Sequence, residues 1–141
     1  MIITSETVKS AISKALSINY PGIKIYKNKV NQGMQRPCFF IAQIETECTK
    51  EAKDRRKINY LVNIRYHKDN ATRTELDEIG FNLLDILESL EDKEPIAYAK
   101  NSRYEIVDDV LQFFTTYSIS MIREKAPGIK MNDLNVNGGL K

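Results

Sequence analysis

The sequence has no tryptophan, a single histidine, His67, and only two cysteines, Cys38 and Cys48, among 141 residues. It also lacks zinc-ligand spacing, a phosphate-cradling glycine loop and a Gly-x-Ser-x-Gly nucleophile motif. The two cysteines lie about 33 Å apart at strand rise, so they cannot form a disulfide with each other in a straight strand. We therefore predict two buried free thiols, no catalytic residue, no metal site and no cofactor.

A strong excess of one charge and long apolar runs are missing too. The chain has 21 Lys and Arg against 19 Asp and Glu, a net charge of +2, whereas a dedicated nucleic-acid-binding domain usually carries a strongly basic face. No apolar stretch approaches the roughly 20 residues that span a bilayer. The first residues do not have the basic and then apolar pattern of a secretory signal. We expect a soluble protein, made in a cytoplasm, with no membrane partner.

Two segments, residues 37–48 and 55–67, alternate apolar and polar side chains with the period of two that is typical of half-buried strands. In the first segment we assign the even-numbered residues, from Cys38 to Cys48, to the apolar face. Phe39 and Ile41 interrupt the other face, so we expect part of that face to be covered too. Thirteen residues of strand reach about 43 Å, but a globule of this size is only about 37 Å across. The pair therefore predicts a long β-hairpin, and its less apolar turn end is expected to overhang the core.

The predicted overhang is crowded with charged side chains. They are Lys50, Glu51, Lys53, Asp54, Arg55, Arg56 and Lys57. Exposed strands carry unpaired backbone groups that invite pairing with another chain. This hairpin tip is therefore either a solvated, charge-protected end or an arm that contacts a neighbouring subunit.

Two segments have helical periodicity. The first can be capped by Thr4 or Ser5 and is expected to end near Asn19, before a Pro-Gly turn. From Thr72 or Thr74, apolar residues at spacings of three and four continue to Leu90 and predict a strongly amphipathic second helix. Gly80 within it costs about 1 kcal/mol relative to alanine, so we expect a close approach to the sheet there. The acidic outer side of this helix is interpreted as a solvated surface and not as a metal cluster.

The remaining segments complete an α+β fold. We predict a short strand at residues 23–27, one interrupted strand or two short ones at 96–107, a turn at Asp108-Asp109 and a last strand at 111–123. The last strand is expected to pair with residues 55–67. Two helices on one face of a mainly antiparallel sheet of four to five strands is the economical arrangement. Residues 1–125 would form this single domain, and residues 126–141, which lose periodicity, a flexible C-terminal tail.

Two other classes of function stay open at this point. Cys38 or Cys48 with His67 would suit a cysteine-based enzyme, although a thiol on an apolar face is usually inert. Tyr60 and Tyr66 could stack on the bases of a nucleic acid, as aromatic residues on RNA-binding sheets do. Both tyrosines nevertheless fall in the phase of the core residues, which favours burial.

Two stretches are specific enough in combination to suggest a family. The first runs from Tyr-Pro-Gly-Ile-Lys-Ile-Tyr at residues 20–26 through Gln-Gly at 32–33 to Arg-Pro-Cys-Phe-Phe-Ile at 36–41. The second is Arg-Tyr-Glu-Ile-Val-Asp-Asp-Val-Leu-Gln-Phe-Phe at residues 103–114, followed by Tyr117. Together they resemble the phage tail terminator, or minor tail, proteins encoded in prophages of Gram-positive bacteria.

This resemblance implies a structural virion protein of the tail, without enzymatic activity, assembled in the cytoplasm of a bacterial host. Such terminators form a ring, commonly a hexamer, that caps the tail tube, stops its polymerisation and offers a surface for head–tail joining. The implied partners are further copies of the chain, the tail tube protein, a head connector or neck protein, and phage DNA that crosses the lumen without sequence-specific binding. The alternative within the virion is a head-completion or connector adaptor protein of the phage neck.

The amphipathic stripe of the second helix leads to a prediction about stability. Leu83→Ala or Leu87→Ala is expected to lower the free energy of unfolding by roughly 2–5 kcal/mol, because each leaves a cavity in the core. Denaturant unfolding measures the change. Values within error of the wild type would show that the stripe does not face the core.

Overall fold

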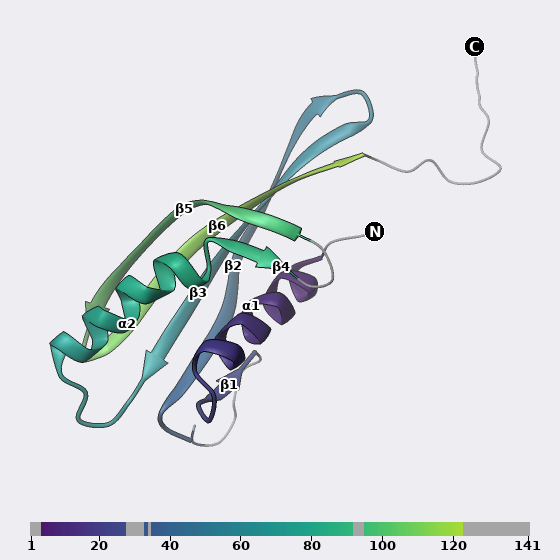
Figure 1. Ribbon diagram of the computed structural model, residues 1–141. Coiled ribbons are helices and arrows are strands. Elements are labelled where there is room, and N and C mark those ends of the chain that lie inside the picture. The colour runs from purple at the N-terminus through teal and green to yellow at the C-terminus, as the bar shows by residue number, and fades with distance from the viewer. Residues whose placement is uncertain (1–3, 28–32, 34, 92–94, 123–141) are drawn as a thin grey trace, which may run out of the picture.

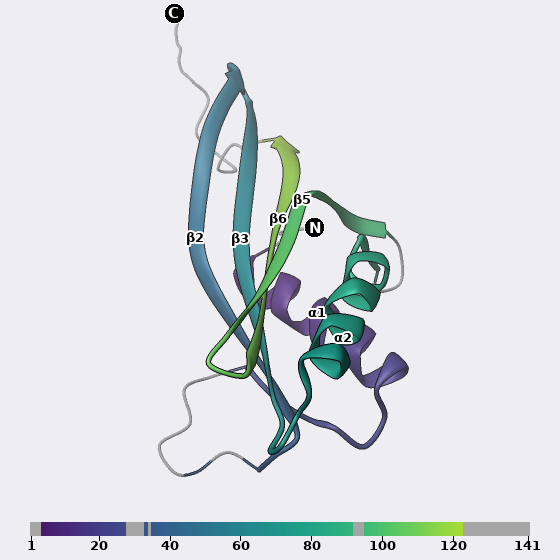
Figure 2. The same ribbon diagram turned by 90° about the vertical axis from the view of Figure 1, so that its left-hand side faces the viewer.

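The computed structural model describes residues 4–27, 33, 35–91 and 95–122. In chain order its elements are α1 (Ser5–Asn19), β1 (Lys24–Tyr26), β2 (Cys38–Ala52), β3 (Arg55–His67), α2 (Arg73–Ile86), β4 (Ser89–Glu91), β5 (Pro95–Val107) and β6 (Val110–Ile122). The strands form one sheet in the order β1-β2-β3-β6-β5-β4. Both helices lie on the same side of this sheet (Figures 1 and 2). The α+β class and the placement of the helices agree with the prediction.

The sheet is larger than the predicted four to five strands, and it is mixed. β1 runs parallel to β2, whereas the other neighbouring strands are antiparallel. The additional strand, β4, consists of residues that the sequence assigned to the end of the second helix. Leu90 is 1% exposed, so its burial was predicted correctly, but it reaches the core from a strand.

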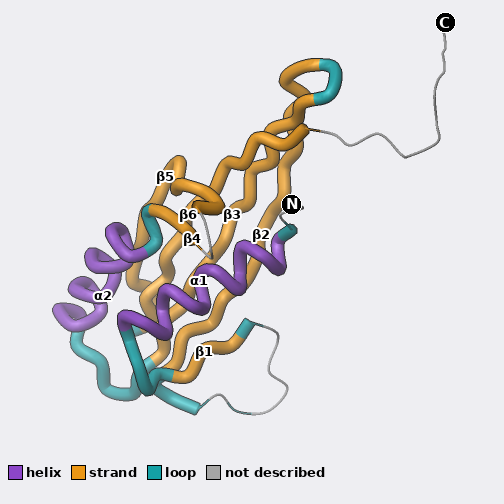
Figure 3. Tube along the Cα trace, turned by 45° about the vertical axis from the view of Figure 1, so that its right-hand side comes forward, coloured by secondary structure: helices purple, strands orange, loops and turns teal. Residues whose placement is uncertain are grey.

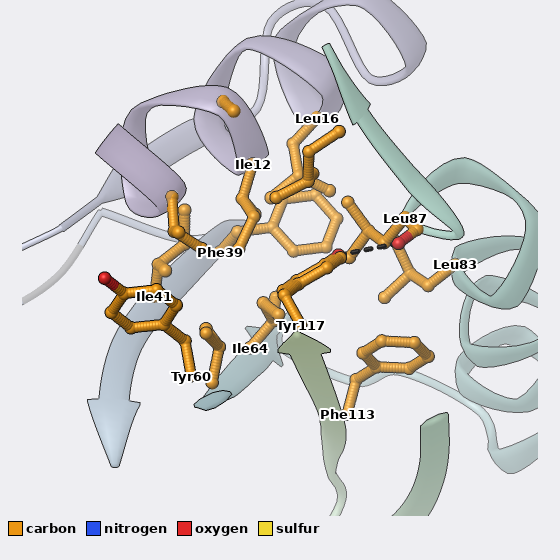
Figure 4. Close-up of a cluster of buried hydrophobic side chains, with 14 of the residues drawn as sticks. Ile12, Leu16, Phe39, Ile41, Tyr60, Ile64, Leu83, Leu87, Phe113 and Tyr117 are labelled. Atoms are coloured by element: carbon orange, nitrogen blue, oxygen red, sulfur yellow. Dashed lines mark hydrogen bonds between the residues drawn. The ribbon is translucent and has the colours of Figure 1, made fainter. Parts of the chain in front are cut away.

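The second helix ends earlier than predicted because groups of the sheet donate hydrogen bonds to the carbonyl groups that follow it. The Tyr117 hydroxyl donates to the carbonyl of Leu87 (2.6 Å), and the amide of Ala99 donates to the carbonyl of Glu88 (2.7 Å). Burial strongly raises the pKa of Tyr117, so its hydroxyl stays protonated and remains a donor. Figure 4 shows this bond in the middle of the core.

The core fills the space between the helices and one face of the sheet. α1 contributes Val8, Ile12 and Leu16, all fully buried. Figure 4 shows Ile12 and Leu16 of α1 in the same cluster as Phe39 of β2 and Tyr117 of β6. Burial of this apolar surface is the main stabilising contribution to a fold of this kind.

Both helices begin where the capping residues predict. The Thr4 hydroxyl accepts a hydrogen bond from the amide of Thr7 (3.3 Å), and the Thr72 hydroxyl accepts one from the amide of Glu75 (3.1 Å). Each bond satisfies an amide that has no partner inside its helix.

A bulge in β2 corrects the predicted phase of that strand. Phe39 and Ile41 are fully buried, so the odd-numbered residues face the helices at the start of β2. The register with β3 shifts at Ile44, and an extra residue moves the following side chains to the opposite faces. Beyond the bulge, Thr46 and Cys48 lie opposite the buried residues of β3. The even-numbered residues therefore face away from the helices before Ile44, which corrects the predicted phase there, although Cys38 is buried as predicted and Phe39 and Ile41 are covered as expected. After Ile44 the predicted phase is right.

The C-terminal half of the sheet follows the predictions closely. β6 pairs with β3, and its odd-numbered residues from Leu111 to Ile119 are buried. The interrupted strand is the single strand β5, with a register shift between Ala99 and Asn101. Asp108 and Asp109 both have positive φ angles, 52° and 61°, as a two-residue hairpin turn of the mirror-image type requires.

Gly80 makes the close approach to the sheet that the sequence predicts. A Cβ atom at this position would lie 2.6 Å from Cδ1 of Tyr104, a residue of β5. The Tyr104 hydroxyl donates to Oδ1 of Asp77, one turn earlier in α2 (2.7 Å). The ring is thus held flat against the helix, where only a glycine leaves room for it.

This contact predicts that Gly80→Ala destabilises the protein by about 1–3 kcal/mol through overpacking, although alanine is the better helix former. Thermal or denaturant unfolding measures the change. Phe81→Ala, at the exposed neighbouring position, is the matched control and is expected to stay within about 0.5 kcal/mol of the wild type.

A double-mutant cycle separates the contact from helix propensity. In a Tyr104→Ala background the ring is gone, and Gly80→Ala is expected to be neutral or stabilising. An equal loss of stability in both backgrounds would contradict the proposed origin of the effect.

Candidate assembly interface

The β2–β3 hairpin extends well past the helices. β2 continues to Ala52 and β3 begins at Arg55, so the turn is only Lys53 and Asp54, and most of the predicted connection at residues 49–54 is strand. The 15 residues of β2 reach about 50 Å, whereas the 15 residues of α1 span about 22 Å. Every β2 residue from Ile44 onward is exposed. Figures 1 and 3 show the tip far from both helices.

The structure brings the predicted charged residues together at this tip. Lys50, Glu51, Lys53, Arg55 and Arg56 are exposed, and Asp54 and Lys57 are half-buried. Across the hairpin, Lys50 lies directly opposite Arg56. Like charges in facing positions of two strands repel each other. This basic pair therefore contributes nothing to the stability of a single copy and is available to a partner.

Sequence reasoning missed two exposed apolar residues in the same region. Ile44, the bulge residue of β2, is 53% exposed, and Ile122 at the end of β6 is 71% exposed. Ile122 lies opposite Arg55 of β3, so β6 runs along the hairpin as a third strand. The one sequence feature that could have indicated the exposure of Ile44 is that polar residues flank it on both sides.

The other face of the sheet carries no helix (Figure 2). The guanidinium of Arg103 lies over the ring of Phe114, 4.3 Å from its centre, and that of Arg65 lies over Phe40 at 4.9 Å. A hollow of about 240 Å³ opens on this face between Glu45 of β2 and Lys100 of β5. This helix-free face therefore carries a shallow hollow and side chains of both charges.

The environment of Cys38 and His67, which suggested a cysteine enzyme, does not favour the protonation states that such an enzyme needs. Cys38 lies opposite His67 in the β2–β3 register. Burial raises the pKa of the Cys38 thiol, while burial and the nearby charges of Arg36 and Arg65 lower the pKa of His67. Both shifts favour neutral side chains, whereas an activated pair needs a thiolate beside an imidazolium.

The other reactive groups found in the sequence do not assemble a site either. Cys48 is exposed, which corrects the prediction of two buried thiols, because β2 has already passed the helices at that point. Tyr60 and Tyr66 are buried in the core, so they form no stacking platform. Within the described ranges, no three His, Cys, Asp or Glu side chains gather as metal ligands would. None of the helices in the described parts combines the length and apolar character needed to cross a membrane.

Strands longer than their core, a charged tip and a sheet face without helices are typical of a structural subunit that binds other chains. A comparison with protein families agrees with this class. The chain matches the model of a family described as phage tail terminator protein over residues 7–129. Because the match covers most of the chain, the protein belongs to the phage tail terminator family and has a structural role in the phage tail. No curated protein matches the chain.

The family match confirms the resemblance found in the sequence. The chain is a virion component that works with other proteins of the phage tail and head. Its origin in a Gram-positive prophage stays a prediction. The predicted C-terminal tail at residues 126–141 lies outside the described residues.

Arg56 of the basic pair and the adjacent Arg55 lead to a prediction about assembly. Reversing Arg55 and Arg56 to Glu is expected to weaken self-association, whereas the thermal unfolding of the monomer stays nearly unchanged, because exposed charges contribute little to stability. Analytical ultracentrifugation and calorimetry measure the two effects. Lys9→Glu with Arg73→Glu, on the two helices, is a control with the same change in charge. A collapse of the fold would show that the tip is buried.

Proposed function

We propose that this chain assembles into a closed ring, a hexamer by analogy with other tail terminators, that caps the finished tail tube and stops its polymerisation. The opposite side of the ring would provide the surface for head–tail joining. The observation that carries the proposal is the hairpin, which places an exposed, charged pair of strands beyond the core of its own subunit.

The hairpin suits a ring better than a simple dimer. A ring joins two different surfaces of the same subunit, and the contact closes by rotation. The tip lies at one end of the sheet, far from the helices (Figure 3). It can therefore reach a neighbouring copy while its own core stays intact.

The charge balance agrees with a channel for DNA. With a net charge of +2 over the chain, a ring would not hold the phosphate backbone by a dense set of cations, which is what strong nonspecific binding needs. DNA could then cross the lumen without being retained. The seven charged residues of the hairpin tip are proposed to contact other protein chains.

Native mass spectrometry and electron microscopy of the purified protein, with and without tail tube protein, test this function. We expect rings of uniform copy number and rings seated on tube ends, with tubes of defined length. A strict monomer that neither forms rings nor attaches to tube ends would contradict the proposal.

The position of the ring in the virion has its own test. Pull-down experiments with the tube protein and with the portal or connector protein, done separately, compare the two partners. Binding to the tube is expected for a terminator. Binding to the portal side alone would instead identify a neck adaptor.

A further inference from the structure

The outer side of α2 carries one large apolar side chain between acidic ones. Phe81 is 62% exposed, and it lies on the side of the helix opposite the buried residues. Glu78 and Asp85, three residues before it and four after it, lie on the same side and are exposed. Among the side chains that the structure describes, none forms an ion pair with either carboxylate. An aromatic centre with a polar rim is typical of a surface that binds protein.

The position of Asp85 in α2 is unfavourable in a single copy. It lies in the last turn of the helix, and that turn contains no basic residue. The carboxyl-terminal end of a helix carries a partial negative charge, which repels a carboxylate and attracts a cation. Positive charge from another chain would therefore be stabilised at this end of α2, beside Phe81.

The other surface is a row of side chains across the arm, the part of β2, β3 and β6 that extends beyond the helices. Lys50 lies opposite Arg56, and Arg56 lies opposite Met121. Arg56 stands two residues before the buried Ile58, so the row is on the face of the sheet that the helices cover in the core. Lys50 and Arg56 are exposed and Met121 is half-buried. The row thus presents two cations and an apolar side chain, far from its own helices (Figure 3).

The two surfaces match in charge and in reach. Glu78 and Asp85 are about 10 Å apart along the helix axis, whereas the facing Cα atoms of Lys50 and Arg56 are about 5 Å apart. Lysine and arginine have long side chains, which can spread to both carboxylates. Contact would relieve the repulsion between the two cations and supply the positive charge that the end of α2 lacks. The sheet face of the row already packs helices in the core, so a helix suits it in shape.

The directions of the two surfaces determine how two copies can meet. The row lies on the helix-covered face of the sheet, and the outer side of α2 points away from that same face (Figure 2). A second copy must therefore be turned over, by about half a turn, to bring its α2 onto the arm of the first. Its own arm then meets the α2 of the first copy. The contact forms twice around a two-fold axis, as in a closed dimer.

We propose that two copies form a two-fold dimer, in which the row Lys50, Arg56 and Met121 of each copy binds the outer side of α2, around Phe81, of the other. This inference goes beyond the proposed function, and the ring remains the proposed functional form. Neighbours in a ring of more than two copies differ by less than half a turn, so this contact is not the ring contact. Dimer and ring both use the hairpin tip and exclude each other. The dimer keeps the tip occupied while the chain is outside a tail.

Charge reversal on one surface at a time tests the contact. One variant carries Lys50→Glu and Arg56→Glu, and the other carries Glu78→Arg and Asp85→Arg. Each variant alone is expected to raise the Kd of the dimer at least about tenfold, because like charges then face each other at both contacts. Analytical ultracentrifugation over a series of protein concentrations at low salt measures the Kd, and circular dichroism checks that each variant is folded.

Combining the two reversals gives the decisive result. A chain with all four substitutions presents an acidic tip to a basic helix, so it is expected to dimerise within about threefold of the wild-type Kd. An equimolar mixture of the two single-surface variants is also expected to recover, as a heterodimer with one chain of each kind, because opposite charges then meet at both contacts. A general effect of net charge would produce neither recovery.

Control variants change the same amount of charge outside both surfaces. Lys24→Glu with Lys100→Glu matches the tip variant, and Glu45→Arg with Glu47→Arg matches the helix variant; all four positions are exposed. Both controls are expected to dimerise like the wild type. Phe81→Ala is expected to raise the Kd about tenfold, while the unfolding of the monomer stays unchanged.

The outcomes separate this inference from the proposed function. A wild-type chain that stays monomeric, or forms rings with no dimer at any concentration, would overturn the two-fold dimer. Controls that dissociate as far as the surface variants, or a four-substitution chain that does not recover, would overturn it as well. Dimers in solution without rings on tube ends would instead overturn the proposed function and leave the dimer intact.

Discussion

The four long strands of this protein, β2, β3, β5 and β6, are about twice as long as the helices that cover the sheet, and the rest of the structure depends on this mismatch. α1 and α2 have 15 and 14 residues and span about 22 Å, whereas β2, β3 and β6 reach about 43 Å or more. Two helices of this length can bury only one end of such a sheet. At the other end the chain places charged residues, and the remaining backbone edges are open to partners.

The end of the sheet that the helices cover holds the exposed end rigid. β3 and β6 pass through the core and continue into the arm without interruption, so the arm is part of the sheet and not a loop. Tyr117 and Tyr104 tie α2 to the sheet through their hydroxyl groups. A surface that is ordered before it binds loses less conformational entropy on association. The packing of the core would therefore lower the entropy cost of the proposed assembly.

Sequence reasoning correctly predicted the features that depend on a local sequence pattern. It failed for the features that depend on how the strands pair. The phases of β3 and β6, the caps of both helices and the contact at Gly80 follow from local periodicity and residue type. The bulge at Ile44 could not be predicted, because it is defined by the register with β3. Leu90 has helical spacing, yet hydrogen bonds from the sheet end the helix before it. The charged tip was visible as a run of charges, whereas the open edges became visible only once the strand order was known.

Open edges are a hazard for a protein that is proposed to form a closed ring and nothing larger. If two copies paired through the same β2 edge, Glu45 and Glu47 would approach their own counterparts, and the repulsion would oppose a dimer of that kind. The β5 edge carries both signs on this face, because Arg103 lies 3.9 Å from Glu105, so it lacks the uniform negative charge of the β2 edge. Contacts between unlike surfaces generate rings when the rotation closes and filaments when it does not. The bulges at Ile44 and Lys100 interrupt the regular part of both edges, and interrupted edges oppose the growth of a flat, open sheet.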